Sequence, residues 1–307
     1  SDLRSTYVTI VHREGRNFDR FARVEEITMT VRVVTDSACD LPEAICAEFD
    51  IEVVPLSIRF GDEELCDRVE ISTEQFWERL PKSSTLPETA APSVGAFETV
   101  FNQLVKDGAT GIVCINISSR MSATMQSAQL AAKALDGLVP IEVIDSKSAS
   151  MGVGMQVLYA ARRAREGATV AEITEEVEDR RDRTHVLFTV DTLEYLKKGG
   201  RIGGAQALLG SVLSIKPVIT VIDGAVETAG KVRTRSKALQ FIIDHVKAES
   251  VEELCVLHGA ATDYREFKAM ADAITPPGQT ALEGEIGPVV GVHTGPGIIG
   301  IVWRSAS

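Results

Sequence analysis

Hydroxyl side chains that follow an apolar run are the first feature of this chain that could bind a ligand. The run from Val113 to Ile117 leads directly into Ser118 and Ser119, and Ser122 stands where a helix is expected to begin. Free N–H groups at the start of a helix attract an anion, and serine hydroxyls beside them add further donors. The segment is equally typical of a well-capped helix, so the residues alone leave both interpretations open.

A histidine near the end of the chain is the second candidate. His293 follows the apolar residues 289–292, which we expect to form a strand, and it precedes a glycine-rich turn that begins at Thr294. A histidine at the end of a strand can reach into a cleft and exchange a proton near neutral pH. The alternative is a histidine that belongs to the core or to the turn.

Two further segments could line the same cleft. The loop from Thr85 to Ser93 is rich in proline and hydroxyl residues, and by itself it is typical of a connector. In the segment from Asp191 to Gly204, Arg201 follows a pair of glycines. By itself this pattern is typical of a helix end at which basic residues complement the helix dipole.

The sequence argues against several classes of function. It contains no phosphate-binding G-x-x-x-x-G-K-[ST] loop, no dinucleotide fingerprint, no H-E-x-x-H and no G-x-S-x-G, so we expect neither a nucleotide cofactor nor a metal. A net charge of −12 disfavours nucleic acid as a partner. Five cysteines without a C-x-x-C pair fit a reducing compartment. No apolar run is long enough to span a membrane and no secretory signal is visible, so the sequence predicts a cytoplasmic protein.

Alternating strand-like and helix-like segments predict an α/β fold. We divide the 307 residues into an N-terminal extension (1–28), an N-terminal α/β domain built on a mostly parallel sheet with flanking helices (29–150) and a C-terminal α/β domain (151–307). The periodicity predicts helices over 41–49, 73–80, 94–106, 122–135, 152–165 and 170–183. It predicts strands over 31–35, 52–60, 111–117, 140–144, 186–190, 218–222, 253–258, 289–292 and 298–303. A cleft between the two domains is the expected ligand site.

The chain resembles the DegV family of bacterial fatty-acid-binding proteins, which includes the lipid-binding subunit of fatty acid kinase. The resemblance extends from Val33 to Trp303. It rests on seven ordered motifs: T-D-S-A-C-D-L from Thr35, Ser118 to Thr124, Asp145-Ser146, Gly152 with Gly154, D-T-L-E-Y-L-K-K-G-G-R-I-G from Asp191, Lys216-Pro217, and G-V-H-T-G-P-G from Gly291. It implies a two-domain DegV-like fold whose C-terminal domain has a mixed sheet.

The resemblance also implies a ligand and a partner. The ligand is one fatty acid of 14 to 18 carbons with its tail in an apolar tunnel, and the partner is an ATP-dependent kinase subunit of the dihydroxyacetone-kinase-like type. The lipid-binding protein has no cofactor and no catalytic turnover of its own. By position, Thr89, Ser118, Ser119 and His293 would hold the carboxylate, with Ser122 and Thr294 as further ligand-binding candidates and Thr85 as a rival to Thr89. Arg201 would serve partner docking, which leaves the head-group site without a guanidinium.

The chain departs from the family pattern at two positions. Ala90 stands where the family has a second hydroxyl, and Ala123 stands where it commonly has glycine.

Two alternative functions remain open. The first alternative is an enzyme, a hydrolase or transferase acting on a lipid-like substrate, in which Ser119 is the nucleophile and His293 the base. The second is a protein that binds some other amphiphile and has no kinase partner. For a fatty acid, burial of ~15 methylenes at ~0.8 kcal/mol each predicts that the tail dominates the affinity.

Overall fold

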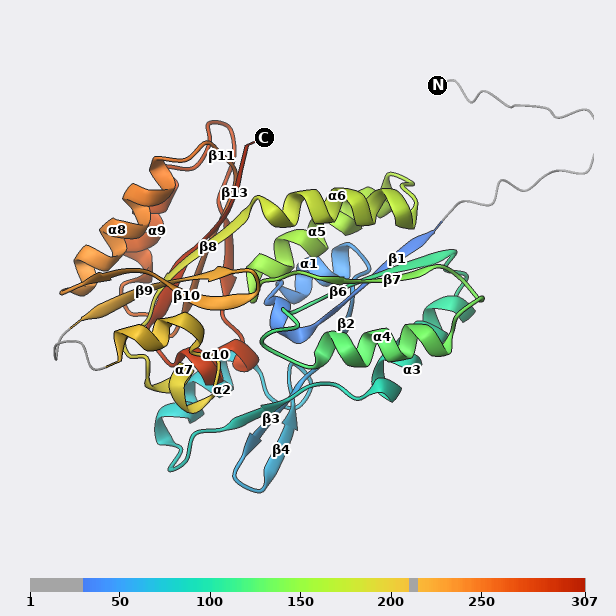
Figure 1. Cartoon of the computed structure of the whole chain (residues 1–307), viewed down its shortest axis with the longest axis horizontal. Coiled ribbons are helices and arrows are strands. Elements are labelled where there is room, and N and C mark those ends of the chain that lie inside the picture. The colour runs from blue at the N-terminus through green and yellow to red at the C-terminus, as the bar shows by residue number, and fades with distance from the viewer. Residues whose placement is uncertain (1–29, 210–214, 307) are drawn as a thin grey trace, which may run out of the picture.

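A parallel sheet forms the centre of the first lobe (Figure 1). The computed structural model describes residues 30–209 and 215–306, so the proposed extension over residues 1–28 lies outside the described part. The strands are ordered β2-β1-β6-β7 and every neighbouring pair is parallel. Their bounds are Val31–Asp36 for β1, Glu52–Val54 for β2, Gly111–Asn116 for β6 and Ile141–Asp145 for β7. The predicted parallel sheet is confirmed.

Helices cover both faces of this sheet because its strands are apolar on both faces. Along β1, Val33 faces one core while Val34 faces the other, as the two-residue period of a strand requires. One face is covered by α3 (Val94–Lys106) and α4 (Thr124–Ala134), and the other by α5 (Met151–Arg165) and α6 (Val170–Asp182). The short helices η1 (Ser37–Cys39) and α1 (Glu43–Glu48) follow β1.

A mixed sheet forms the second lobe, as expected. Its order is β10-β9-β8-β13-β11-β12, and all pairs are antiparallel except β11 with β12. Helices α8 and α9 pack on one face of the sheet, while the other face is turned towards the first lobe. The bounds are Thr184–Thr189 (β8), Lys216–Ile222 (β9), Ala225–Val232 (β10), Arg235–Lys247 (α8), Val251–Gly259 (β11), Tyr264–Asp272 (α9), Leu282–Glu285 (β12) and Ile298–Ser305 (β13).

A small antiparallel sheet, β4-β3-β5, and the five short helices α2, η2, α7, η3 and α10 lie near the junction of the lobes. The strand predicted over 52–60 is in fact two strands, because Pro55 has no N–H to donate and the chain leaves the parallel sheet there. The bounds are Ser57–Phe60 (β3), Glu63–Cys66 (β4), Thr73–Arg79 (α2), Leu80–Lys82 (η2), Glu88–Ala90 (β5), Glu194–Lys198 (α7), Gly203–Leu208 (η3) and Pro288–Thr294 (α10).

The strand predicted over 289–292 is wrong, because these residues belong to helix α10. Pro288 occupies the first turn, where its fixed φ and missing N–H favour a helix start. Val289 and Val292, three residues apart, are both buried on one side of the helix. A short apolar run fits a strand and a buried helix equally well, which is why periodicity alone failed here. His293 therefore lies in the last turn of a helix and not at the end of a strand.

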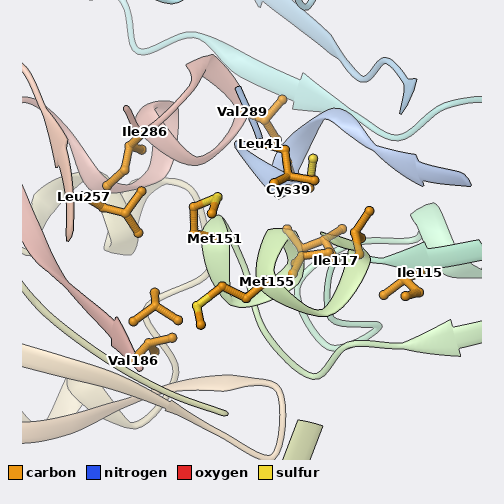
Figure 2. Close-up of a cluster of buried hydrophobic side chains, with 14 of the residues drawn as sticks. Cys39, Leu41, Ile115, Ile117, Met151, Met155, Val186, Leu257, Ile286 and Val289 are labelled. Atoms are coloured by element: carbon orange, nitrogen blue, oxygen red, sulfur yellow. The ribbon is translucent and has the colours of Figure 1, made fainter. Parts of the chain in front are cut away.

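The two lobes share one continuous apolar core (Figure 2). Met151 and Met155, from the first two turns of α5, lie between Ile115 and Ile117 of the first lobe and Val186 of the second. We call this cluster, together with Cys39, Leu41, Leu257, Ile286 and Val289, the interlobe core. Helices α5 and α6 follow residue 150 in sequence but pack on the parallel sheet. The domain boundary at residue 150 stays a prediction, and the packing favours assigning both helices to the first lobe.

Shortening a side chain of the interlobe core should destabilise the whole protein. Leu257 is 0% exposed, so Leu257→Ala should lower the free energy of unfolding by ~2 to 5 kcal/mol through lost burial and a new cavity. Leu130 is 50% exposed, and Leu130→Ala should change that free energy by less than ~0.5 kcal/mol. Urea unfolding of both variants checks this, and equal effects would mean that Leu257 is not in the shared core.

Candidate ligand-binding site

A cavity lies between the lobes, next to the interlobe core. It contains about 1010 Å³ of space between its atoms, a figure that includes the part open to solvent. Its walls are mostly aliphatic and come from both lobes: Leu56, Ile117, Met121, Val186, Phe188, Leu196, Ile219, Val221, Val226, Ile286, Val289, Val290 and Ile298. A cavity of this composition favours an apolar ligand.

Polar side chains join this apolar lining at a few positions. Thr89 on β5 and His293 on α10 are 204 residues apart in sequence, yet Thr89 Oγ1 lies 3.1 Å from His293 Nε2. Ser122 and Thr294 also line the cavity. Thr89, Ser122, His293 and Thr294 were all predicted from the sequence, and the fold brings them to one cavity.

The imidazole of His293 is held in its neutral form. Burial, and secondarily the nearby charge of Arg201, lower the pKa of His293 from 6.5 to about 4. Its Nδ1 atom is buried and has no hydrogen-bond partner among the described residues. A Cβ atom on Gly199 would come within 2.2 Å of Nδ1, so only glycine fits beside the ring. The neutral ring can offer a hydrogen bond to a ligand without carrying a charge.

Two predicted serines lie away from the cavity lining. Ser118 Oγ donates to the carbonyl of Gly224 at 2.7 Å, and Ser119 Oγ donates to Asp145 Oδ2 at 2.5 Å. Both hydroxyls are therefore used in contacts within the protein. Ser122 lines the cavity instead, although it is not the N-cap we expected, because α4 begins at Thr124.

Thr85 and Thr89, the two rivals for one role, lie in different hollows. Thr85 lies in a separate shallow hollow with Leu80 and Tyr195, whereas Thr89 lines the cavity. Strand β5 holds Thr89 there by pairing it with Ile58 of β3. No sequence pattern indicated this strand, because three residues are too few to show a period.

Arg201 occupies the mouth of the cavity, although the sequence favoured a head-group site without arginine. Its Nε donates to the carbonyl of Met121 at 3.0 Å and its Nη1 to the carbonyl of Gly199 at 2.7 Å. The side chain is exposed and also lines the cavity. A guanidinium is thus available both to a ligand head group and to a partner that approaches the mouth.

The T-D-S-A-C-D-L motif that begins at Thr35 positions part of the cavity wall. Asp36 accepts hydrogen bonds from the side-chain amide of Asn116 at 3.1 Å and from the N–H of Ile117 at 2.8 Å. Ser37 Oγ accepts from the N–H of Leu56 at 3.1 Å. Burial raises the pKa of Asp36 to about 6, against the effect of these donors. Ile117 and Leu56 both line the cavity, so a buried polar cluster fixes two of its apolar residues.

The geometry does not support the enzyme alternative. The Ser119 hydroxyl donates to Asp145, whereas His293 Nε2 contacts Thr89. The Ser119–His293 pair on which that alternative rests is therefore not formed. Among residues 30–209 and 215–306, no group of His, Cys, Asp and Glu side chains could hold a metal ion. Within the same residues, no helix has the length and hydropathy needed to cross a membrane.

The fold and the cavity define a class of two-lobed α/β proteins that enclose a largely apolar cavity with a polar mouth. Residues 30–306 match the family model described as "Uncharacterised protein, DegV family". The chain belongs to the DegV family. The resemblance noted in the sequence is thereby confirmed, and so is the mixed α/β fold that it implied.

Known relatives match this chain over almost their whole length. A DegV domain-containing protein of Streptomyces coelicolor is 38% identical over 90% of this chain and 98% of its own length. A fatty-acid-binding DegV family protein from Thermus thermophilus has a solved structure that matches this one with a TM-score of 0.84. It is 35% identical over 91% of this chain and 100% of its own length. A stearic-acid-binding protein from Eubacterium ventriosum has a TM-score of 0.80 and 29% identity over 89% and 98%.

Protonation of His293 should couple to stability in a defined pH window. Because the pKa of His293 is lowered from 6.5 to about 4, its contribution to stability is complete above pH 6.5 and is lost as the pH falls towards 4. The loss amounts to ~3 kcal/mol at most. Buried carboxyl groups change the stability over the same pH range, so the contribution of His293 is the difference between the wild type and His293→Gln in urea unfolding from pH 4 to 7. The wild type should lose more stability than the variant, or gain less, as the pH falls. An imidazole that titrates near 6.5 by NMR would contradict the assignment.

Proposed function

We propose that the protein binds one long-chain fatty acid in the interlobe cavity and presents the carboxylate at the mouth to a partner kinase, which forms the acyl phosphate. The observation that carries the proposal is an aliphatic cavity with a few convergent hydrogen-bonding groups, Thr89, Ser122 and His293 among them. The fatty acid binding of the Thermus protein and the stearic acid of the Eubacterium protein support it. We expect the ligand to have 14 to 18 carbons and the protein to act in the cytoplasm.

The tail supplies most of the affinity under this proposal. Each buried methylene contributes ~0.8 kcal/mol, so a tail of ~15 methylenes gains ~12 kcal/mol before ordering costs. Hydrogen bonds to a charged group add ~1.5 to 3 kcal/mol each, which is a smaller share of the total. Selection among fatty acids then depends on how the tail fits the lining of the cavity.

The head group is bound in a way that keeps the carboxylate reactive. Hydroxyls of Thr89 and Ser122 and the neutral ring of His293 can donate hydrogen bonds without forming an ion pair. A bidentate guanidinium pair would hold both carboxylate oxygens and weaken them as nucleophiles towards phosphorus. Nη1 and Nε of Arg201 already donate to backbone carbonyls, which leaves the arginine fewer donors for such a pair.

The protein itself performs no turnover under this proposal, and the phosphoryl donor comes from the kinase. Arg201 at the cavity mouth is exposed, so it could contact such a partner. An arginine at an interface commonly anchors a partner, and here the same side chain would mark where the ligand emerges.

Protein purified without added lipid should carry about one fatty acid per chain. Native mass spectrometry should show a mass increment of one 14- to 18-carbon acid, which organic extraction then identifies. Val290→Trp should lower the occupied fraction, because Val290 lines the cavity and a larger side chain fills part of it. Wild-type protein that is lipid-free and takes up neither palmitate nor oleate would refute the proposed function.

Loss of the head-group hydroxyls should weaken binding without abolishing it. Thr89→Ala and Ser122→Ala should each raise the Kd for oleate by ~10- to 100-fold, the equivalent of one hydrogen bond to a charged group. Thr85→Ala and Ser119→Ala are matched controls, since these hydroxyls do not line the cavity. Fluorescence titration with the four variants checks this. Controls that lose as much affinity as the site variants would show that the head group is bound elsewhere.

A further inference from the structure

Asp40 closes the T-D-S-A-C-D motif and has no place in the cavity lining. It follows η1, is 4% exposed and has a left-handed backbone with φ of 52°. It borders a groove outside the cavity, on whose rim Gly287 also lies. A buried carboxylate is costly unless it is hydrogen-bonded, so its partners indicate what it does.

The two oxygens of Asp40 contact two different segments of the cavity wall. Oδ2 accepts a hydrogen bond from the hydroxyl of Ser150 at 2.5 Å, and Oδ1 accepts from the backbone N–H of Gly287 at 3.0 Å. Ser150 lines the cavity and immediately precedes α5. Gly287 is the N-cap of α10. One side chain therefore joins the β1–α1 connection of the first lobe to the starts of both helices.

Gly287 fits this contact closely. A Cβ atom there would lie 2.7 Å from Asp40 Oδ1, so a side chain would push the carboxylate away. The residues on either side of Gly287 line the cavity: Ile286 before it, and Val289, Val290, His293 and Thr294 after it. A shift at Gly287 would move the helix that carries the His293 ring.

We propose that Asp40 is the positioning residue of the interlobe cavity, and that its hydrogen bonds to Ser150 and Gly287 hold α10 and His293 in the geometry that retains the fatty acid. The inference rests on the proposed function for its ligand. The contact itself concerns the protein alone and can be tested without a ligand.

Asp40 also makes this contact sensitive to pH. Burial raises the pKa of Asp40 to about 7, Asp67 adds to the rise, and Ser150, Arg68 and the N–H of Gly287 oppose it. The same groove is lined by six other charged or titratable residues: Glu43, Arg68, His258, Tyr264, Glu283 and Glu285. Cys255 is also near, since burial and, after it, the charges of Glu283 and Asp40 raise the pKa of its thiol. The ionised carboxylate accepts the two hydrogen bonds more strongly than the acid does. Retention of the ligand should therefore improve as the pH rises from 6 to 8.

The test compares Asp40→Ala, Asp40→Asn and Ser150→Ala with the wild type, each loaded with cis-parinaric acid, an 18-carbon acid that loses fluorescence on release. At pH 8 the release rate should rise about tenfold or more in Asp40→Ala and a few-fold in Ser150→Ala. Asp40→Asn can still accept from Gly287, so it should stay within about threefold of the wild type. The wild type should release faster at pH 6 than at pH 8, and Asp40→Asn should lose that difference.

Hydrogen exchange of the ligand-free proteins supplies the second readout. Amides from Gly287 to Thr294 should exchange faster in Asp40→Ala than in the wild type, while those of α9 should not change. Asp67→Asn is the matched control, because Asp67 is also buried beside Arg68 but makes no hydrogen bond to α10 in the structure.

These outcomes separate the two proposals. If the wild type binds no fatty acid, the proposed function fails, and exchange at α10 alone decides the role of Asp40. Unchanged exchange and release in Asp40→Ala, or a wild-type pH profile in Asp40→Asn, would overturn the positioning role. If Asp40→Ala does not fold, Ser150→Ala decides in its place, and wild-type release from that variant at pH 8 would have the same force.

Discussion

The structure depends on burying the inner face of the six-stranded sheet. Helices α8 and α9 cover its outer face, whereas the inner face presents Val186, Phe188 and Ile219. No single element covers that inner face, and the start of α5, helix α10 and the loops of the first lobe each cover a part. The cavity is the space that these segments leave above the strands. An apolar chain that filled it would be enclosed by these side chains, which favours a lipid-like ligand over a polar one.

Separate segments form a reliable wall only if they are fixed relative to one another. Aliphatic contacts are not directional, so the buried polar groups at the end of β1 do this: Asp36 holds Ile117 and Ser37 holds Leu56. Asp67 and Asp36 lie near the charge of Arg68, and burial raises the pKa of Asp67 to about 6. Burying carboxyl groups costs stability as the pH rises from 4 towards 7. These buried carboxyl groups, with their cost in stability, lie where the two lobes and the cavity meet.

The sequence predicts those parts of the fold that carry a clear local pattern of apolar and polar residues. The parallel sheet, its helices and the candidates Thr89, Ser122, His293 and Thr294 follow from strand–helix alternation and from the family resemblance. Ser118 and Ser119 could not be placed correctly, because their partners Gly224 and Asp145 are far away in sequence. Residues 289–292 fit a strand and a buried helix equally well, because four apolar residues carry no period. The pairing of β8 with β13 in the middle of the six-stranded sheet has no local signature at all.

The charge of the protein bears on how it can bind an anion. With a net charge of −12 the molecule as a whole repels a carboxylate, and the described residues that line the cavity include one arginine beside neutral donors. Under the proposed function, burial of the tail would make a stronger electrostatic attraction unnecessary, because hydrophobic contacts alone would outweigh that long-range repulsion, which salt screens. The head-group site is thus free to be selected for reactivity instead of affinity. A neutral His293 beside Thr89 would suit the proposed function, since it could orient a carboxylate and leave its charge available to an incoming phosphoryl group.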